Sequence, residues 1–461
     1  MLPGRNSPFR RALGRLFATT AVIAALVAPA SPARAAPAGL VEQDITFSSG
    51  DLTLHGTVIA PETGTPRPAM VMVHGSGRVT RDGYRREAEA FARAGIVTLI
   101  YDKRPKRSRS DVDFRLLADD ALAASRALRA QAGVDPARTG LWGVSEGGWV
   151  APLAASGSTE VAFVVTVGAP GMAPERQQSW NLVNRLAAAG VTGSLVGTVS
   201  RTTLGLLVGA GVFPEAGYDP APVLERITQP VLGLWGALDR VIPAAESMRV
   251  FQESFDRGGN GHYALRAVPG ADHTMRLSPA GFQRGDEVSP AYLEQVATWV
   301  DGLAAAPPTT EVGPAPHQEQ RSTPVEAGSP WVQLGAVVVL LVAFAGYGVG
   351  AAVRRLRGRR EAGSGRRAAR GAATTGLLSV LGLLGYLGHL ASSGAKSLGP
   401  VVAGRPLPWL GLQLLAVAAV VATAATIPAW WRARSDVRLG LLVAGGVVFV
   451  PWAVHWGLLL P

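Results

Sequence analysis

The sequence predicts an α/β domain with a doubly wound, mostly parallel sheet, followed by four transmembrane α-helices. Between residues 69 and 303, short apolar runs rich in β-branched residues alternate with helical stretches, which is typical of βαβ units. These runs are apolar without alternation, which indicates a sheet covered by helices on both faces. After residue 331 the chain consists mainly of long apolar runs. The 461 residues are therefore expected to form more than one structural unit.

The expected elements of the α/β domain follow from this alternation. Runs at 45–47 and 52–59 precede the first helix and predict an antiparallel hairpin at the sheet edge. More than 60 residues separate two of the later strands, too many for one crossover, so a helical cap is expected at 172–218. The expected strands are 69–73, 96–101, 139–142, 161–167, 231–235 and 264–268, and the expected helices are 84–94, 114–131, 147–155, 244–255 and 290–303.

The N-terminus has the features of a secretory signal peptide over residues 1–36. Four arginines precede an uncharged run at 16–28, and an Ala-x-Ala cleavage site follows. The alternative is an uncleaved first membrane helix, but the run is shorter than the roughly 20 residues that span a bilayer. In either case the domain at 37–303 is expected to be exported.

The region 331–461 contains four apolar stretches that predict membrane helices, at 331–353, 374–390, 409–428 and 439–460. Eight arginines lie between the first two and three between the last two, whereas the middle loop has only Lys396 and Arg405. By the positive-inside rule the two basic loops are cytoplasmic. The sequence thus predicts a multi-pass protein of the cell membrane with an extracytoplasmic α/β domain. Residues 304–330, rich in Pro, Ala, Thr and Glu, are expected to be a flexible linker.

Charge and composition exclude several classes of partner. The net charge of +11 arises from the N-terminal 36 residues and from the membrane region, and residues 37–330 carry a net charge of −5. No basic stripe interleaved with aromatic residues is present in the exported part, so nucleic acid is not the expected partner. The chain has no Cys, no His-x-x-x-His and no P-loop motif, so neither a metal nor another cofactor is expected.

The segment Gly143-Val144-Ser145-Glu146-Gly147-Gly148 carries the strongest chemical signal. It lies directly between an expected strand and an expected helix, where a serine nucleophile can occupy a strained turn. Such a turn needs small flanking residues because its backbone is strained and the sheet packs close by. Ser145 is therefore the candidate nucleophile.

A base and an orienting acid are expected to follow Ser145 in the order acid, then histidine. Asp239 comes just after the strand at 231–235, and His273 comes just after the strand at 264–268. The rivals are Asp272, whose side chain should point away from its neighbour His273, and His262, which precedes its strand. We therefore predict a triad of Ser145, Asp239 and His273.

A tetrahedral intermediate would also need main-chain N–H donors for its oxyanion. One expected donor is the N–H of Glu146, which follows the nucleophile at the start of a helix. The other is expected from the loop after the strand at 69–73, and we choose Ser76. The adjacent His74 is expected to shape this loop without taking part in proton transfer.

Several motifs over residues 40–303 give this chain a family resemblance. They are His74-Gly75-Ser76-Gly77 with Arg81-Asp82-Gly83, the run 91–96, Leu99-Ile100-Tyr101-Asp102-Lys103-Arg104, the Ser145 segment, and the Asp239 and His273 segments. With these motifs the chain resembles bacterial esterases of the α/β-hydrolase superfamily, in the dienelactone-hydrolase and prolyl-oligopeptidase-like branches. One departure is that the stiff, basic segment 105–110 stands where the family usually has a Gly-containing turn. That segment would suit an acidic or phosphorylated substrate or the headgroups of the membrane, or it is simply solvated.

Two classes of function remain open at this stage. The first is a serine hydrolase of carboxylic esters or thioesters with a small-molecule or lipid-like acyl substrate; an acyltransferase or a peptidase would show the same motifs. The second is a membrane protein whose helices carry the function, with the α/β domain as a sensor or scaffold without catalysis.

Overall fold

The computed structural model describes residues 39–461 except 63, 78–79, 106–112, 284, 359–364 and 434–435. The predicted signal peptide, residues 1–36, lies outside the described residues, as does most of the basic segment 105–110. The described chain divides into two compact units. One, the sheet unit, contains residues 39–180 and 213–323, and the other, the helical unit, contains residues 181–212 and 324–461.

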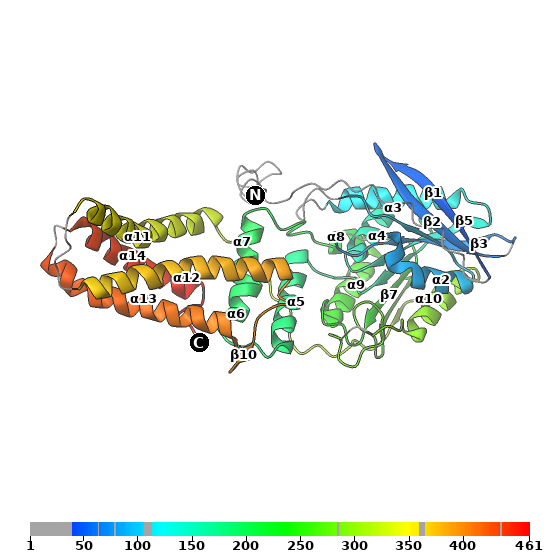
Figure 1. Ribbon diagram of the computed structural model, residues 1–461. Helices are drawn as coiled ribbons and strands as arrows, with labels where there is room; N and C mark the ends of the chain where they lie inside the picture. Colours follow the sequence, from blue (N-terminus) through cyan, green and yellow to red (C-terminus); the bar gives the residue numbers. More distant parts are fainter. Residues whose placement is uncertain are drawn as a thin grey trace. The chain divides into compact units, whose positions relative to one another are not determined.

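The sheet unit is built on nine strands in the order β1-β2-β4-β3-β5-β6-β7-β8-β9 (Figure 1). β1 and β2 form the expected antiparallel edge hairpin, β2 also pairs antiparallel with β4, and all later pairs are parallel. The predicted doubly wound, mostly parallel sheet is confirmed. The strands are β1 (Leu40–Ser49), β2 (Leu52–Pro61), β3 (Arg67–Val73), β4 (Val97–Tyr101), β5 (Val134–Val144), β6 (Val164–Val167), β7 (Val231–Gly236), β8 (Tyr263–Val268) and β9 (Glu311–Val312).

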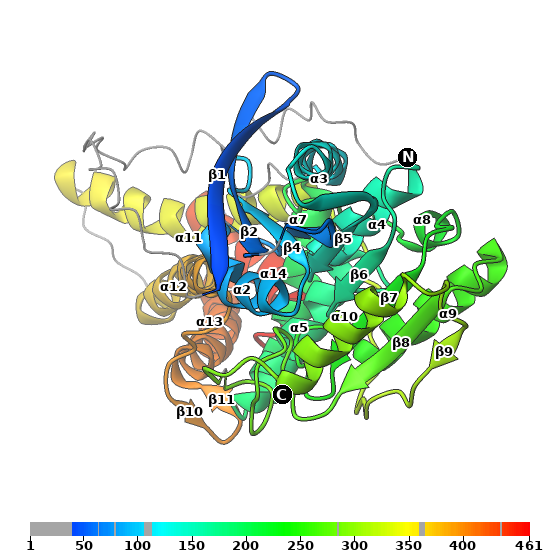
Figure 2. The same cartoon turned by 90° about the vertical axis from the view of Figure 1, so that its right-hand side faces the viewer.

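Helices cover both faces of this sheet, and Figure 2 views them from the side. Helices α2 and α10 pack on one face through residues such as Phe91 and Val296, which are fully buried beside Met70 and Met72. Helices α3, α4, α8 and α9 pack on the other face. These helices are α2 (Arg85–Arg93), α3 (Phe114–Arg129), α4 (Gly147–Ser156), α8 (Ala221–Leu224), α9 (Ala244–Gly258) and α10 (Pro290–Gly302), with a short 3₁₀ turn η1 (Arg81–Tyr84).

The chain after α10 differs from the flexible linker expected at 304–330. Residues of β9 pair with β8, and Trp180 Nε1 donates a hydrogen bond of 3.0 Å to the carbonyl of Gln320. The carboxylate of Glu246 accepts hydrogen bonds from the main-chain N–H of Ser322 at 2.7 Å and from its hydroxyl at 2.6 Å. Residues 311–322 are thus held against the rest of the sheet unit by specific contacts that their composition does not indicate, whereas 324–330 belong to the helical unit.

The helical unit contains four helices that are long and apolar enough to cross a membrane. Exposed large apolar residues are frequent on their surfaces, for example Val342, Val421 and Val447, as expected where lipid is the solvent. Small residues permit close packing inside the bundle, since a Cβ added at Gly445 would lie 2.2 Å from the Cβ of Ala343. The helices are α11 (Pro330–Leu356), α12 (Arg366–Ser393), α13 (Leu407–Arg432) and α14 (Val437–His455), with a small hairpin of β10 (Val401–Val402) and β11 (Arg405–Pro406) between α12 and α13.

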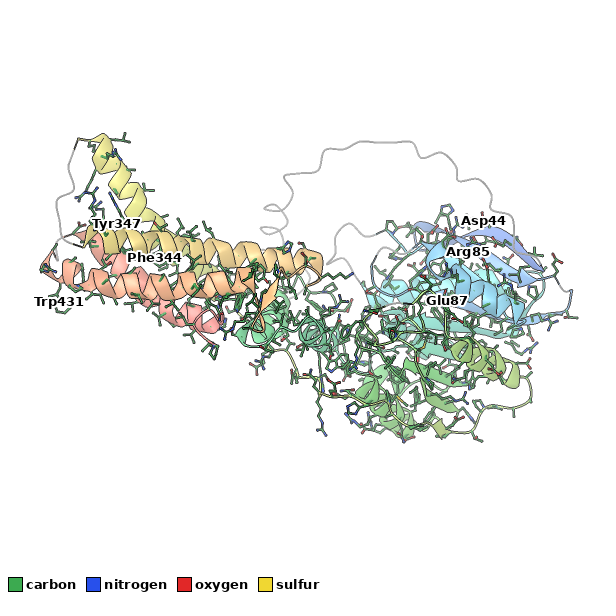
Figure 3. The ribbon with its side chains drawn as sticks, turned by 60° about the horizontal axis from the view of Figure 1, so that its bottom comes forward. Asp44, Arg85, Glu87, Phe344, Tyr347 and Trp431 are labelled. Carbon is green, nitrogen blue, oxygen red and sulfur yellow. The ribbon has the colours of Figure 1, made fainter. Side chains whose placement is uncertain are left out.

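Aromatic contacts join α11 to α14 within this bundle. The rings of Phe344 and Phe449 meet edge to face at 5.8 Å, and the guanidinium of Arg438 lies 5.6 Å from the ring centre of Tyr347. Figure 3 labels Phe344 and Tyr347 on α11. Since Arg438 lies near the first turn of α14 and Tyr347 lies in the later part of α11, the two helices are antiparallel neighbours.

Part of the segment expected to form a cap belongs to the helical unit. The N–H of Thr192 donates to the carbonyl of Gly404 at 2.8 Å, and the N–H of Ser194 donates to Pro461 at 2.9 Å. Added Cβ atoms at Gly205 and Gly209 would collide with the main chain at Glu326 and Gly328. Residues 181–212 therefore pack with the chain around the membrane helices, whereas 172–180 and 213–218 remain with the sheet unit. The elements here are α5 (Pro174–Ala188), α6 (Ser194–Gly197), the π-helical η2 (Thr198–Thr203) and α7 (Leu204–Gly209).

The contacts of Glu246 predict the protease sensitivity of the segment after α10. Burial opposes the charge of Glu246, but hydrogen bonds from Ser322 and Gln318 and the ion pair with Arg176 outweigh it and hold its pKa below the usual value. We expect Glu246→Ala to accelerate tryptic cleavage after Arg321 at neutral pH by at least about tenfold, because one hydrogen bond to a charged group contributes roughly 1.5 kcal/mol. Mass spectrometry of timed digests measures this rate.

The matched control is Glu253→Ala on the same helix, which removes a half-exposed pair with Arg249. Because the pKa of Glu246 is lowered, the carboxylate stabilises the docked segment fully above the ordinary carboxyl pKa. This stabilisation is lost as the pH falls through the lowered value. Equal cleavage of both variants and the wild type would contradict this account of the segment.

Candidate active site

Ser145 directly follows the last residue of β5, two residues before α4 begins at Gly147. Its φ of +56° places a non-glycine residue in the left-handed region, which is strained. Its N–H donates a hydrogen bond of 2.9 Å to the carbonyl of Val167 at the end of β6, and its carbonyl accepts one of 2.8 Å from Gly148. The strand–turn–helix geometry expected from the sequence is present around this serine.

The glycines around Ser145 are required by close approach of the main chain. A Cβ at Gly143 would lie 2.1 Å from the carbonyl oxygen of Gly147, and one at Gly147 would lie 2.5 Å from the carbonyl oxygen of Val73. A Cβ at Gly148 would lie 2.4 Å from the Cβ of Ala169. The turn is therefore pressed against β3 on one side and the chain after β6 on the other.

Asp239 and His273 meet as the sequence analysis expected. Asp239 Oδ2 lies 2.8 Å from Nδ1 of His273, and its other oxygen, Oδ1, accepts hydrogen bonds of 2.8 Å from the N–H groups of Val241 and Ile242. The Asp239 side chain is fully buried and that of His273 is 12% exposed. The carboxylate is thus fixed by main-chain donors on one oxygen and orients the imidazole with the other.

Gly168 connects the His273 ring to the serine turn. It has a φ of +54°, and an added Cβ would lie 2.8 Å from Nδ1 of His273. Gly168 follows Val167, whose carbonyl holds Ser145, so both side chains flank the end of β6. Among the described residues no hydrogen bond joins Ser145 Oγ to His273; such bonds often tighten only when substrate binds.

Asp272 and His262, the alternative acid and base, lie outside the Asp239–His273 pair and have other partners. Asp272 uses its Oδ1 to accept hydrogen bonds from Thr274 N at 2.7 Å and Arg276 N at 3.0 Å, so it shapes the loop that carries His273. His262 precedes β8, at the opposite edge of the sheet, and its Nδ1 lies 2.9 Å from the carbonyl of Pro308.

The loop after β3 lies beside the nucleophile. A Cβ at Gly75 would lie 3.5 Å from the Cβ of Ser145, and the N–H of Gly75 donates to the hydroxyl of Tyr84 at 3.1 Å. Within the described part of the chain, the main-chain N–H groups of Ser76 and Glu146 donate no hydrogen bond. Both donors are thus available at the two segments that flank Ser145.

His74 is buried in this loop, 2% exposed, with the ring of Tyr101 at 4.7 Å. Burial and the nearby charge of Lys103 lower its pKa to about 3. A histidine that is neutral and enclosed at physiological pH suits the loop-shaping role expected for it and not the transfer of protons.

The charged triplet that follows β4, residues 102–104, has partners that the sequence alone did not indicate. Asp102 accepts a hydrogen bond of 3.0 Å from the N–H of Arg81, and Arg104 forms a two-pronged ion pair with Asp120 at 2.6 and 2.5 Å. Lys103 Nζ donates to the carbonyl of Gly75 at 2.7 Å and forms an ion pair with Glu146. Their position in the sequence could have indicated this. Charged residues directly after a fully buried strand lie at the carboxyl edge of the sheet, where their charges need partners.

A cavity of about 130 Å³ lies on the α2 and α10 side of the same edge. Its wall includes Val144 and Thr274, the chain neighbours of Ser145 and His273, and Val167, whose carbonyl accepts the hydrogen bond of the Ser145 N–H. Glu87, labelled in Figure 3, and Arg276 add charge to its lining, with their side chains 3.6 Å apart. Among the described residues, no group of His, Asp or Glu is arranged to hold a metal ion.

A serine in a strand–turn–helix elbow, followed along the chain by a carboxylate and a histidine at the ends of later parallel strands, defines the α/β-hydrolase fold. The chain has this fold. No protein-family model matches it.

The known proteins similar to this chain include hydrolases. Thiohydrolase aneE of Aspergillus aculeatus is 36% identical over 130 residues, which cover 27% of this chain and 40% of the relative. Esterase EstD of Thermotoga maritima is 23% identical over 294 residues, or 57% of this chain and 68% of the relative. A solved dienelactone hydrolase of Anabaena variabilis covers 56% of this chain and 94% of its own, at 19% identity and a TM-score of 0.37. The resemblance to esterases and other hydrolases is confirmed by these two relatives, and the chain spans less than half the length of the thiohydrolase.

The contacts of the two aspartates predict different consequences of the same substitution. We expect Asp239→Asn to lower kcat for ester hydrolysis by roughly 10⁴, because an amide cannot hold His273 in the tautomer that accepts a proton from serine. Asp272→Asn keeps its Oδ1 acceptor for the loop and should cost far less. Steady-state kinetics, with circular dichroism to check folding, measures both; the opposite ranking would refute the assignment of Asp239.

Proposed function

We propose that this chain is a serine hydrolase that cleaves carboxylic esters or thioesters. The observation that carries the proposal is the convergence at the end of β6: a strained serine, and a histidine held at 2.8 Å by a buried aspartate. Serine needs an adjacent base to act as a nucleophile, and this arrangement supplies a base with a fixed orientation.

In the proposed reaction, Ser145 Oγ attacks the substrate carbonyl carbon while Nε2 of His273 takes the serine proton. Asp239 stabilises the resulting imidazolium, and the N–H groups of Ser76 and Glu146 bind the oxyanion. His273 then gives its proton to the leaving alcohol or thiol as the carbonyl re-forms. Water repeats the sequence on the acyl-enzyme, with His273 again as base, and releases the acid and Ser145.

The names of the similar proteins support an ester or thioester as substrate, since one is a thiohydrolase and another an esterase. Acyltransferases and peptidases share the same triad chemistry. An acyltransferase passes the acyl group to an alcohol or an amine in place of water, and a peptidase cleaves an amide in place of an ester. The competing class is a scaffold without catalysis, and labelling with a fluorophosphonate probe distinguishes it from a serine hydrolase.

We further propose that the α/β domain faces the extracytoplasmic side of the cell membrane. The structure has four helices of sufficient length and hydropathy to cross it. Arginines cluster over 354–370, where α11 ends and α12 begins, and again over 432–438, where α13 ends and α14 begins, whereas the chain between α12 and α13 contains only one arginine, Arg405. This distribution supports cytoplasmic loops at the two basic positions.

An activated serine attacks phosphorus as it attacks carbon, so a fluorophosphonate probe tests the function directly. We expect the full-length protein in detergent to be labelled at Ser145, as identified by peptide mass spectrometry. Labelling should vanish in Ser145→Ala and fall strongly in His273→Ala. A folded wild-type protein that stays unlabelled and hydrolyses no short-chain ester would favour the scaffold class.

Reporter fusions test the proposed orientation in cells. Alkaline phosphatase folds only outside the cytoplasm, so we expect fusions after Ala306 to be active and fusions within 357–367 to be inactive. The reverse activity pattern would place the α/β domain in the cytoplasm and refute the orientation.

A further inference from the structure

Lys103 is a buried cation beside the candidate nucleophile. It follows β4 and its side chain is only 4% exposed, and it is paired with the carboxylate of Glu146, which is 9% exposed. Removing an ammonium group from water is costly unless a partner and hydrogen bonds compensate. Because Glu146 is the residue after Ser145, this ion pair places a positive charge directly against the serine turn.

The second contact of Lys103 reaches the other side of the nucleophile. Its Nζ donates a hydrogen bond of 2.7 Å to the carbonyl oxygen of Gly75. The carbonyl of Gly75 and the N–H of Ser76 belong to one planar trans peptide group, in which they point in opposite directions. Fixing the oxygen therefore fixes the direction of the Ser76 N–H.

The Gly75 residue is also held from its amino side. Its N–H donates to the hydroxyl of Tyr84 at 3.1 Å, and a Cβ at this position would lie 3.5 Å from that of Ser145. Hydrogen bonds on its N–H and on its carbonyl thus hold Gly75 in its orientation toward the serine. Lys103 supplies the only contact described here that joins this loop to the Glu146 side chain.

We propose that Lys103 is a positioning residue that aligns the two main-chain donors of the oxyanion hole, on Ser76 and Glu146, with one another. The inference rests on the proposed hydrolase function and adds a residue that the triad does not include. A cation bound to the Gly75 carbonyl also polarises the shared peptide group, so the Ser76 N–H becomes a stronger donor. Lys103 itself exchanges no proton with the substrate.

The alignment matters because the oxyanion forms only in the transition state. Donors that are correctly placed beforehand lower the barrier without strengthening substrate binding, and the loss of one donor typically costs about 10²–10³ in kcat. A merely structural ion pair would instead affect the melting temperature and leave kcat of the folded enzyme unchanged.

The test compares Lys103→Met with Arg104→Met in the full-length protein. Arg104 is the next residue and forms an ion pair with the buried carboxylate of Asp120, its own side chain being 21% exposed, so its substitution breaks an ion pair away from the serine turn. With p-nitrophenyl acetate we expect Lys103→Met to lower kcat about 100-fold with KM changed less than about threefold, and Arg104→Met to leave kcat within about threefold. The affinity of a trifluoromethyl ketone, which forms an oxyanion with serine, should fall in parallel with kcat.

A double variant, Lys103→Met with Glu146→Gln, leaves no unpaired buried charge and guards against misfolding. It should melt near the wild-type temperature and remain about as slow as Lys103→Met. If a folded Lys103→Met or double variant keeps the kcat and inhibitor affinity of an active wild type, the inference is overturned and the proposed function stands. If the wild type itself neither labels nor hydrolyses, the proposed function fails and the inference fails with it.

Discussion

The left-handed backbone of Ser145 is the constraint around which the sheet unit is arranged. A non-glycine residue in this region costs of the order of 1–3 kcal/mol, and it persists only where its surroundings over-determine it. Here the surroundings are the hydrogen bond to Val167, the contact of Gly147 with β3 and that of Gly148 with Ala169. The same close approach leaves room only for glycine at position 168, and the His273 ring lies in that space. The strained backbone of Ser145 and the position of the His273 ring thus depend on the same close packing around the end of β6.

Sequence reasoning predicted the features that depend on local pattern. Strand and helix positions follow from apolar periodicity, and the Ser145 turn follows from glycines whose spacing has a steric cause. Asp239 and His273 were predicted because in this fold the acid and then the histidine follow the serine along the chain, and because parallel strands present their carboxyl ends at one edge of the sheet. Their meeting at 2.8 Å needed the structure, as did the separate tasks of Asp272 and His262.

Other features depend on partners far away in the chain, and no local pattern encodes them. The partners of Lys103 are 28 and 43 residues away in sequence, and those of Glu246 are 70 to 76 residues away. The proline-rich composition of residues 304–330 indicates little regular structure. It does not indicate whether side chains from other parts of the chain bind this segment. Likewise, the apolar residues of 181–212 indicate that this segment must be buried, without indicating against which surface.

The division of the chain into units has a consequence for how the protein is made. The chain passes from the sheet unit to the helical unit after residue 180, returns after 212 and leaves again after 323. Apolar side chains such as Leu195 and Leu204 therefore emerge from the ribosome while the helices of their own unit are still unmade. At about 5–20 residues per second, the rest of the chain takes on the order of 10–50 s to synthesise. During that interval these side chains lack the helices that bury them in the finished protein, and a fragment that ends before α11 would lack them permanently.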